Sequence, residues 1–392
     1  MISYEEAKVI LLERVTPMPD ETCGLSQASG RVLRQRVCAD RDFPPYDRVM
    51  MDGYALRASD LALSEMFRVA DVAPAGAAMV VLPGQTFQCI EVMTGAVMPH
   101  GADLIVPVEM TAKLGDGMVR IDSRHPFSVG QHLHRKGSDA KEGDVLLESG
   151  RVLGAREIGI AASCGLPVLT TARLPRIAIQ PTGDELVHVE DAPLPHQIRQ
   201  SNGYALAAGL ARCGYHAEVL PVMRDDVSDD AFATIIDSYD FLIVTGAVSK
   251  GARDFVPKML DNAGCECLFH GVAQRPGKPL GTWLGNHGCM ILALPGNPVS
   301  AMTGLFAMVI PAIEKSLGKI REPLARVHLD AVYRTPPGLT VHLPVKRLAG
   351  NRVMASAGAN SGDFIGLIQS DGWITVPADS AMQQDYEFHS WL

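Results

Sequence analysis

The stretch from Arg176 to Leu317 repeats a strand, a loop and a helix, and this repetition limits the possible folds more than any other feature of the sequence. Short apolar runs, typical of buried strands, alternate with amphipathic helical patterns. The apolar runs are Arg176–Gln180, Phe241–Thr245 and Met290–Leu294; the helical patterns are Ser201–Cys213, Ser228–Asp237, Phe255–Asn262 and about Pro298–Leu317. Strands that alternate with helices predict crossover connections and a mostly parallel sheet, hence an α/β domain.

Each apolar run ends in a loop of small and polar residues, namely 181–185, 246–251 and 295–298. In open parallel sheets, ligands bind in the crevice outside the carboxyl ends of the strands. We therefore expect one site at one edge of the sheet. The polar side chains expected there are Asp184, Glu185, Ser249, Asp254, Lys278 and Ser300.

The regions on either side of this stretch are rich in short strands separated by Gly and Pro. The expected strands are Met79–Leu82, Gln88–Val92, Leu104–Val108 and Met118–Ile121 before it, and Val327–Tyr333, Thr340–Leu348, Val353–Ala355 and Ile374–Val376 after it. Two helices are also expected, over Ser3–Val15, where Ser3 and Glu6 form a capping-box pattern, and over Ala155–Ser163. The pattern predicts a multidomain α/β plus β protein.

Charge and cysteine usage exclude several classes of protein. The chain has 392 residues, too many for one ordinary core, and its net charge of −9 contains no block of like charge, so neither a nucleic-acid nor an anionic-membrane surface is expected. The acidic N-terminus does not resemble a signal peptide, and no apolar run approaches the ~18 residues of a membrane span. Eight scattered Cys without a CxxC pair favour a reduced protein of the cytoplasm.

The loop Thr182–Glu185 places two adjacent carboxylates just after a strand. Adjacent side chains diverge, so this pair suits Mg²⁺, which takes one or two carboxylates together with substrate phosphate oxygens, better than it suits acid–base chemistry. A capping role for Asp184 fits the pattern equally well. Asp254 is either a helix N-cap or a second magnesium ligand, and Asp225 and Asp226 fit exposed capping acids.

Two cations flank a Pro-Gly turn at Arg275–Pro279 and are spaced to converge on one small oxyanion or phosphate. Ser300 lies in the first turn of the last helix, and helix N-termini bind anions. No Walker A or GxGxxG pattern is present, which argues against P-loop NTPases and dinucleotide enzymes. From the residues alone we infer a nucleotide or phosphorylated-cofactor transferase with a divalent cation and a pocket for a tetrahedral anion.

Two stretches of the first β-rich region, Asp42–Ala55 and Met93–Glu109, are unusual in composition, but each fits an ordinary Gly-containing turn or loop. The segment Gly130–Gly143 contains His132 and His134 without a carboxylate or a third His at metal spacing. A solvated turn is therefore favoured there over a metal site.

Taken together, seven motifs resemble those of the MoeA family of molybdopterin molybdenumtransferases, which is related to the E domain of gephyrin. In chain order they read PPYDRVMMDGYA, MTGAVMPHGAD, TGDEL, the SN of Ser201 and Asn202, TGAVSKG followed by Asp254, RPGKP and LPGNPVS. The resemblance covers essentially the whole chain. It implies a helical linker domain over 1–40 and 143–173, an elongated β domain over 41–142, a MoaB/Mog-like α/β domain over 174–320 and a C-terminal β-barrel over 321–392.

The resemblance also implies a reaction in which adenylylated molybdopterin and molybdate give molybdenum cofactor and AMP, with Mg²⁺ as cofactor. It implies a homodimer whose active sites combine the α/β domain of one subunit with the β domain of the other. Molybdopterin adenylyltransferase and molybdoenzyme maturation proteins are the further partners expected. Residues expected to act in catalysis are Asp52, Glu185, Asp254 and Lys278; in ligand binding, Thr94, Asp139, Thr182, Gly183, Asp184, Ser249, Arg275, Pro279, Ser300 and Ser361; and in metal binding, Glu185, Asp225, Asp226 and Asp254.

Several positions depart from the commonest family pattern: Pro181 replaces a Ser, Ala247 a Gly, Lys250 a small apolar residue, His134 an Arg, and either Pro344 or Lys346 stands for a basic residue. Two alternatives to the transferase follow. One is a family member that acts as a cofactor carrier or scaffold, although a scaffold has no need of the carboxylates and Lys278. The other is a paralogue that handles tungstate.

Overall fold

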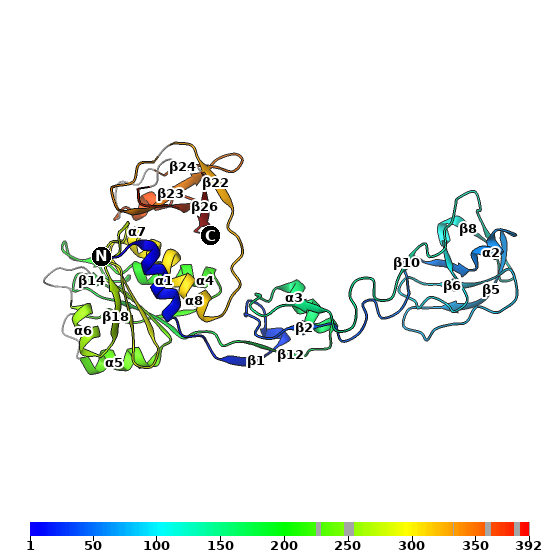
Figure 1. The fold of residues 1–392 in the computed structure, drawn as a ribbon, viewed down its shortest axis with the longest axis horizontal. Helices are drawn as coiled ribbons and strands as arrows, with labels where there is room; N and C mark the ends of the chain where they lie inside the picture. Colours follow the sequence, from blue (N-terminus) through cyan, green and yellow to red (C-terminus); the bar gives the residue numbers. More distant parts are fainter. Residues whose placement is uncertain (225–228, 247–254, 332, 357–361, 380–384, 392) are drawn as a thin grey trace. The chain divides into compact units, whose positions relative to one another are not determined.

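The computed structural model describes residues 1–224, 229–246, 255–331, 333–356, 362–379 and 385–391 (Figure 1). Contacts divide the chain into two compact units. The first unit contains Met1–Arg34, Ser149–Gly154 and Val168–Leu392, and the second contains Gln35–Glu148 and Ala155–Pro167. The finer division into four domains stays a prediction. Within the described ranges, no helix has the length and apolar character needed to span a membrane.

A six-stranded sheet forms the centre of the first unit. Its strands, in spatial order, are β16 (Ala217–Val219), β13 (Ile177–Pro181), β17 (Phe241–Thr245), β21 (Met290–Leu294), β20 (Gly281–Leu284) and β18 (Glu266–His270). The first four strands are parallel, and β20 and β18 are antiparallel to their neighbours. The predicted mostly parallel sheet is confirmed. The bounds of the three predicted apolar runs agree with those of β13, β17 and β21 to within one residue.

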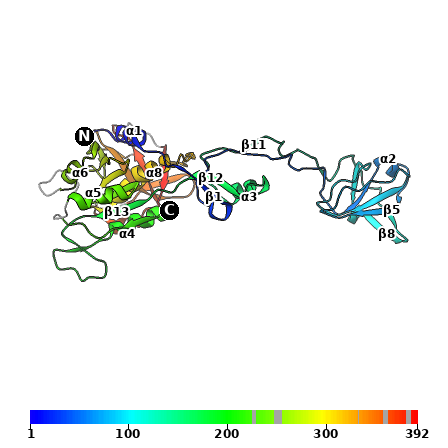
Figure 2. The same ribbon diagram turned by 90° about the horizontal axis from the view of Figure 1, so that it is seen from below.

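Helices cover both faces of this sheet (Figures 1 and 2). Along β13, β17 and β21, alternate residues point to opposite faces. One face packs against α4 (Asn202–Arg212) and a continuous helical run of α7 (Pro298–Gly304), the π-helical segment η3 (Leu305–Val309) and α8 (Ile310–Ser316). The other face packs against α5 (Asp229–Ser238) and α6 (Val256–Asn262). Burial on both faces explains why the strands read as uninterrupted apolar runs.

The first helix, α1 (Tyr4–Arg14), also packs on the face covered by α4 and α8. Its capping box is confirmed: the backbone N–H of Glu6 donates to Ser3 Oγ at 3.1 Å, and the N–H of Ser3 donates to Glu6 Oε2 at 2.9 Å. After α1, the strand β1 (Asp20–Gly24) pairs antiparallel with β12 (Val168–Ala172). The chain thus leaves the α/β region along β1 and returns to it along β12, so that both passages lie in one two-stranded ribbon.

The C-terminal region closes into a five-stranded barrel, as predicted. Its strands are β22 (Arg326–Leu329), β23 (Thr340–Arg347), β24 (Arg352–Ala355), β25 (Gly372–Val376) and β26 (Asp385–Ser390). They pair in the order β23, β24, β22, β26 and β25, and β25 pairs again with β23. A short strand of the α/β region, β19 (Gln274–Arg275), adds to β23 in parallel. The barrel is therefore joined to the α/β region by main-chain pairing.

An aromatic cluster of four side chains joins the barrel to the helical run. The Trp373 ring stacks on His389 at 4.6 Å between centroids, and its centroid lies 4.6 Å from that of Trp391. Phe306 of η3 contacts both indoles, at 5.5 and 5.4 Å. Trp373 is only 2% exposed, so the contact that it makes between the barrel and the helical run is buried.

The second unit is built on a six-stranded sheet. Its strands, in spatial order, are β7 (Leu104–Pro107), β4 (Gly53–Leu56), β6 (Gln88–Val92), β5 (Met66–Ala73), β9 (Met118–Ile121) and β8 (Thr111–Gly115). The strand predicted over Met79–Leu82 is wrong, because this segment makes only an isolated bridge between Val81 and His100. Helix α3 (Ala155–Ser163) has the predicted bounds. At Gly53 a Cβ would lie 2.0 Å from the carbonyl oxygen of Val106, which explains the glycine of the Asp-Gly turn.

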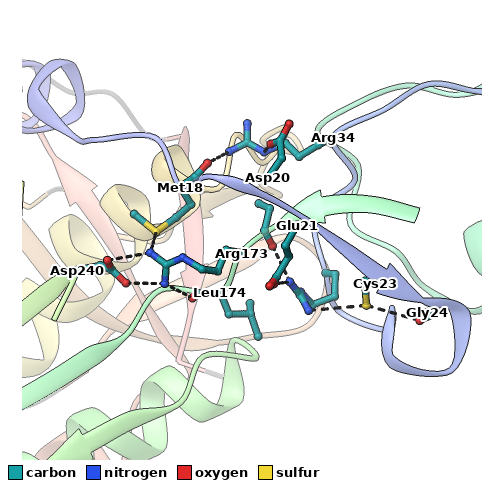
Figure 3. Close-up of polar contacts among 11 residues, drawn as sticks. Met18, Asp20, Glu21, Cys23, Gly24, Arg34, Arg173, Leu174 and Asp240 are labelled. Carbon is teal, nitrogen blue, oxygen red and sulfur yellow. Dashed lines mark hydrogen bonds and ion pairs between the residues drawn. The ribbon is translucent and has the colours of Figure 1, made fainter. Parts of the chain in front are cut away.

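Arg173 and Asp240 hold the β1–β12 ribbon against the central sheet of the first unit (Figure 3). Both terminal nitrogens of Arg173 donate to the Asp240 carboxylate, each at 2.9 Å, and the backbone N–H of Arg176 donates to it at 2.7 Å. Burial would raise the pKa of Asp240, whose side chain is only 13% exposed. The hydrogen bonds from Arg173 and Arg176 outweigh that effect, so its pKa lies below the usual range.

Asp240→Asn is expected to lower the free energy of unfolding of the first unit by about 1–3 kcal/mol at neutral pH, because it breaks a charge-assisted pair. The stabilisation from a carboxylate with a depressed pKa is present above its unfolded-state pKa and is lost as pH falls through its folded-state pKa. The difference between Asp240→Asn and the parent chain should therefore narrow as pH falls below about 4, the ordinary pKa of an Asp side chain. Urea unfolding followed by Trp fluorescence measures this, since the three Trp all lie in the first unit.

The exposed Asp237, which lies 3.8 Å from His287, provides a matched control. Asp237→Asn should change the unfolding free energy by a few tenths of a kcal/mol only, roughly the value of an exposed ion pair. An equal loss in both variants, or a loss in Asp240→Asn that persists at low pH, would contradict the assignment.

Candidate active site

Four loops meet at one edge of the central sheet. The last residues of the three central parallel strands are in register, since Pro181 pairs with Thr245, and Thr245 with Leu294. Strand β20 runs the other way and begins beside β21, where Gly281 pairs with Ala293. The loop 275–279, which leads into β20, therefore lies at the same edge. The strand ends from which the polar loops leave are therefore side by side, as predicted, although residues 247–251 of the second loop lie outside the described residues.

A cavity of about 550 Å³ opens at the ends of β13, β17 and β21. Thr182 and Glu185 line it together with Asn202 and Gly246. The backbone N–H and the hydroxyl of Thr182 both donate to the carbonyl oxygen of Thr245, at 2.9 and 3.0 Å. Thr182 thus fixes the crossing between two strand-end loops.

Gly246 at the end of β17 cannot carry a side chain. Its φ is +94°, in the left-handed region that favours glycine. A Cβ there would lie 2.4 Å from the carbonyl oxygen of Thr182. The two loops can approach this closely only because residue 246 is a glycine.

The predicted Ser201–Asn202 motif has a supporting role at the same edge. Asn202 Nδ2 donates to the carbonyl oxygen of Gly296 at 2.7 Å and so ties the start of α4 to the loop after β21. The loop 295–298 is thereby held between the cavity and the sheet.

The two adjacent carboxylates after β13 have different surroundings. Glu185 lines the cavity, and its carboxylate lies directly over Gly183, where a Cβ would be 2.7 Å from Glu185 Oε2. Both side chains are exposed, but Asp184 does not line this cavity. Of the two neighbouring carboxylates, the cavity therefore receives that of Glu185.

The part of the chain that the structure describes contains no group of three His, Cys, Asp or Glu side chains placed to hold a metal ion. The predicted ligands Asp225, Asp226 and Asp254, with Ser249 and the departures at Ala247 and Lys250, lie outside the described residues. Glu185 fits a hard cation that takes one or two protein carboxylates and completes its shell with substrate oxygens and water.

A second cavity, of about 510 Å³, lies between the loop 275–279 and the C-terminal barrel. All four residues predicted to line the anion pocket contribute to it: Arg275, Lys278, Pro279 and Ser300. The guanidinium of Arg275 and the ammonium of Lys278 form no hydrogen bond or ion pair with any other residue that the structure describes. Two uncompensated positive charges therefore face this cavity.

The two cavities adjoin each other. Both are lined by Pro279, Pro295 and Asn297. A ligand that spans them would meet the carboxylate of Glu185 at one end and the two cations at the other. This arrangement suits a substrate with a phosphate-bearing group that contacts a divalent cation and a second anionic group beside Arg275 and Lys278.

Barrel residues form the far wall of the second cavity, and sequence reasoning missed most of them. Pro344 lines the cavity, whereas Lys346 is exposed and does not. Ser361 lies outside the described residues, but Ser356 and Asp363 on either side of it line the cavity. Tyr333 and His342 line it as well. Sequence reasoning had named Pro344 and Ser361 from this region but not Tyr333 or His342, although a polar His within the apolar run of β23 could have pointed to this wall.

In the second unit, predicted residues from two separate motifs come together. Asp52 Oδ1 accepts hydrogen bonds from the backbone N–H and the hydroxyl of Thr94, each at 2.7 Å. These two bonds hold the pKa of Asp52 below its usual range. An exposed carboxylate is thus kept charged and fixed in direction.

The third residue predicted in this unit, Asp139, pairs with His134. The distance from His134 Nε2 to Asp139 Oδ1 is 2.7 Å, and this contact lowers the pKa of Asp139. His134 Nδ1 also lies 3.0 Å from Arg48 Nη2. His134, where an Arg is usual in the family pattern, here links an acidic and a basic side chain.

Comparison with protein families identifies two regions. A family described as "MoeA N-terminal region (domain I and II)" matches residues 2–165, and one described as "Probable molybdopterin binding domain" matches residues 178–315. A molybdopterin molybdenumtransferase of a Synechocystis species is 35% identical over 403 residues, with 100% of each chain covered. One from Synechococcus elongatus is 32% identical over 393 residues, with 96% of each chain covered.

Solved structures share the fold. A crystal structure of a molybdopterin biosynthesis MoeA protein from Pyrococcus horikoshii has a TM-score of 0.80 and 25% identity, and covers 100% of this chain and 99% of that one. A second structure of a MoeA protein from the same organism has a TM-score of 0.82 and 24% identity, covering 99% and 98%. The likeness extends over the whole chain and is not confined to the α/β region.

Proposed function

The chain belongs to the MoeA family of molybdopterin molybdenumtransferases, and on this premise we propose that it transfers molybdenum from molybdate to an adenylylated molybdopterin, with release of AMP and with Mg²⁺ as the activating ion. One observation supports the proposal most: two adjoining cavities, one with the carboxylate of Glu185 and the other with the cations of Arg275 and Lys278, which have no partner among the described residues. The reaction joins two anionic substrates, so uncompensated cations in an acidic chain serve to bring them together.

The residues of the chain have separable roles in this proposal. Glu185 would hold Mg²⁺ at the strand ends, and the ion would polarise the phosphoanhydride as a Lewis acid. Lys278 and Arg275 would bind molybdate and the terminal phosphate of the pterin and offset their charge. Asn202 and Thr182 keep the loops around the ligand in place through their backbone contacts. No protein nucleophile is needed.

We propose that the working form is a homodimer, in which Asp52, Thr94 and Asp139 of the partner's β domain complete the site. The support is that Asp52 is charged, exposed and fixed by Thr94, as expected of a residue that meets a ligand from another chain. We also assign the protein to the cytoplasm, a reducing compartment, because all eight of its Cys are free.

Incubation of the purified protein with adenylylated molybdopterin, Mg²⁺ and molybdate, followed by measurement of AMP, tests the proposal. We expect AMP release that depends on molybdate and stops when the divalent cation is chelated. Glu185→Gln should reduce the rate by about 10- to 100-fold, the range typical of residues that support a catalytic metal. Glu190→Gln, on an exposed side chain of the same loop region, is the matched control and should behave as the parent chain.

The same assay separates the alternatives. Tight binding of the adenylylated pterin with no AMP release under any oxyanion would identify a carrier or scaffold. A kcat/KM with tungstate far above that with molybdate would identify a tungstate-handling enzyme. A rate of AMP release that depends on neither molybdate nor tungstate would contradict the proposed reaction.

A further inference from the structure

A buried chain of hydrogen bonds connects the C-terminal barrel to the loop that carries Arg275 and Lys278. His342 of β23 is only 1% exposed, and Gln274, the residue before Arg275, is 2% exposed. His342 Nε2 lies 3.2 Å from Gln274 Oε1, and His342 Nδ1 lies 3.2 Å from Thr375 Oγ1. Gln274 Nε2 then donates to the carbonyl oxygen of Gly277 at 3.1 Å. Each polar side-chain atom in this series of hydrogen bonds has a partner.

The bond from Gln274 to Gly277 determines which atom donates and which accepts at each step of this series of hydrogen bonds. The Gln274 amide gives its N–H to Gly277, so its oxygen must accept from His342 Nε2–H. The other nitrogen, Nδ1, is then an acceptor for the hydroxyl of Thr375. The imidazole is neutral, since burial, followed by the charges of His389 and Lys8, lowers the pKa of His342 to about 3. The protein thus fixes a single tautomer.

Backbone hydrogen bonds also support the loop. The carbonyl oxygens of Gly277 and Lys278 also accept backbone N–H groups, from Leu280 at 3.1 Å and from Val272 at 2.9 Å. The side chains of Arg275 and Lys278 have no partner within the described ranges and extend into the cavity. The direction of both cations is therefore decided by the backbone of 275–278, and Gln274 is the side chain whose hydrogen bond fixes that backbone.

Three elements meet at His342. Its ring contacts the Tyr4 ring of α1 edge to face at 4.6 Å, its Nδ1 faces Thr375 of β25, and its Nε2 faces Gln274 of β19. Strand β19 pairs with β23 at Gln274 and Arg275, next to the loop. A shift of the barrel relative to the α/β region would therefore reach the loop of the two cations through this main-chain pairing and through the contact of His342 with Gln274.

We propose that His342 and Gln274 are positioning residues, which fix the Arg275–Lys278 loop from the barrel and thereby set the affinity of the second cavity for a small tetrahedral oxyanion. The inference rests on the proposed function only for the identity of that anion. It assigns the barrel a part in anion binding through residues that do not themselves carry charge. Buried polar chains of this kind rigidify what they connect when every member is satisfied.

Two readouts test the inference on the full-length protein. Hydrogen exchange of the peptide that spans 272–280 reports on the loop without any ligand, and titration calorimetry with sodium molybdate reports on the cavity. His342→Leu and Gln274→Met remove the hydrogen bonds but keep an apolar side chain of similar length. Both should speed exchange at Val272 and Leu280 by about tenfold and weaken molybdate binding by about tenfold, equivalent to roughly one net hydrogen bond.

Two further variants separate positioning from general stability. His342→Gln keeps an N–H near the position of Nε2 and should restore most of the loop protection and of the affinity. Val327→Ala truncates another buried side chain of the same barrel without touching the chain of hydrogen bonds, and should leave loop exchange and affinity unchanged. Faster loop exchange in Val327→Ala as well, or no change in His342→Leu and Gln274→Met, would overturn the inference.

The two readouts also keep this inference apart from the proposed function. If the parent chain bound no molybdate, the proposed function would fail while the exchange data still decided whether His342 and Gln274 fix the loop. If molybdate bound normally and affinity did not respond to the variants, the proposed function would stand and the positioning role would fall.

Discussion

Lys278→Met is expected to reduce kcat/KM for molybdate-dependent AMP release by about 100-fold, since loss of one preorganised contact to reacting negative charge typically costs about 10²–10³ in rate. Lys278 faces the anion cavity with no partner of its own among the described residues, so its charge is fully available to a ligand. Steady-state kinetics with varied molybdate measure the effect. The KM for molybdate should rise, whereas affinity for the adenylylated pterin should change less, because that ligand retains its contacts in the first cavity.

Lys315→Met is the matched control, since Lys315 is an exposed lysine of α8 that lines neither cavity. It should keep the parent activity. An equal loss in both variants would mean that net charge, and not the local pair of cations, matters. An unchanged kcat/KM in Lys278→Met would remove the second cavity from the reaction.

Subunit mixing extends this test to the proposed dimer. Lys278→Met and Asp52→Asn are each expected to be inactive alone. If the site takes Lys278 from one subunit and Asp52 from the other, random pairing of the two variants gives mixed dimers with one intact site, and roughly a quarter of the parent activity should return. No recovery, although the mixed dimer forms, would exclude a shared site.

Trp373→Ala should lower the free energy of unfolding by about 3–5 kcal/mol, the usual cost of deleting a large buried aromatic side chain. Trp373 lies at the centre of the cluster with His389, Trp391 and Phe306, so its loss removes the contact between the barrel and η3. Barrel residues form one wall of the second cavity, so activity should be lost when the barrel no longer packs on the α/β region. Urea unfolding and near-UV circular dichroism measure the change.

Trp373→Phe provides the comparison. The indole N–H of Trp373 is buried and, among the residues that the structure describes, has no hydrogen-bond partner. Its removal leaves no partner unsatisfied, whereas the phenyl ring keeps the stacking on His389. The Phe variant should retain most of the stability that the Ala variant loses. Equal loss in the two would show that volume, and not the aromatic contact, holds the layers together.

The α/β region could be predicted from sequence because its signals are local. Apolar runs such as Phe241–Thr245 are buried on both faces, and the capping pattern of Ser3 and Glu6 specifies a helix start within four residues. Strand ends that carry small and polar residues predicted the edge at which the two cavities lie for the same reason: parallel strands bring their carboxyl ends together. Arg275, Lys278, Pro279 and Ser300, which the sequence predicted to share an anion site, all line one cavity, and their role there stays a prediction.

The parts that escaped prediction depend on contacts between distant segments. The far wall of the second cavity includes barrel residues that were not predicted, such as Tyr333 and His342. His342 comes close to Gln274 because β19 pairs with β23. The residue pattern alone did not separate two adjacent carboxylates: both are exposed, but Glu185 lines the first cavity and Asp184 does not. The false strand at Met79–Leu82 has the right composition but only one bridge partner, His100.

The division of the first unit along the chain has a consequence for biosynthesis. Its N-terminal piece ends at Arg34, yet α1 must pack against segments made much later: the Tyr4 hydroxyl donates to the carbonyl oxygen of Ala307 at 3.4 Å, 303 residues away. On the ribosome, residues 35–167 emerge as a nearly complete unit and can fold first, since domains generally fold as units during synthesis. The apolar face of α1 stays uncovered until the segments that pack against it, which extend to Leu317, have been synthesised. Nascent chains of this family should therefore need chaperone protection of their first fifteen residues until translation is almost finished.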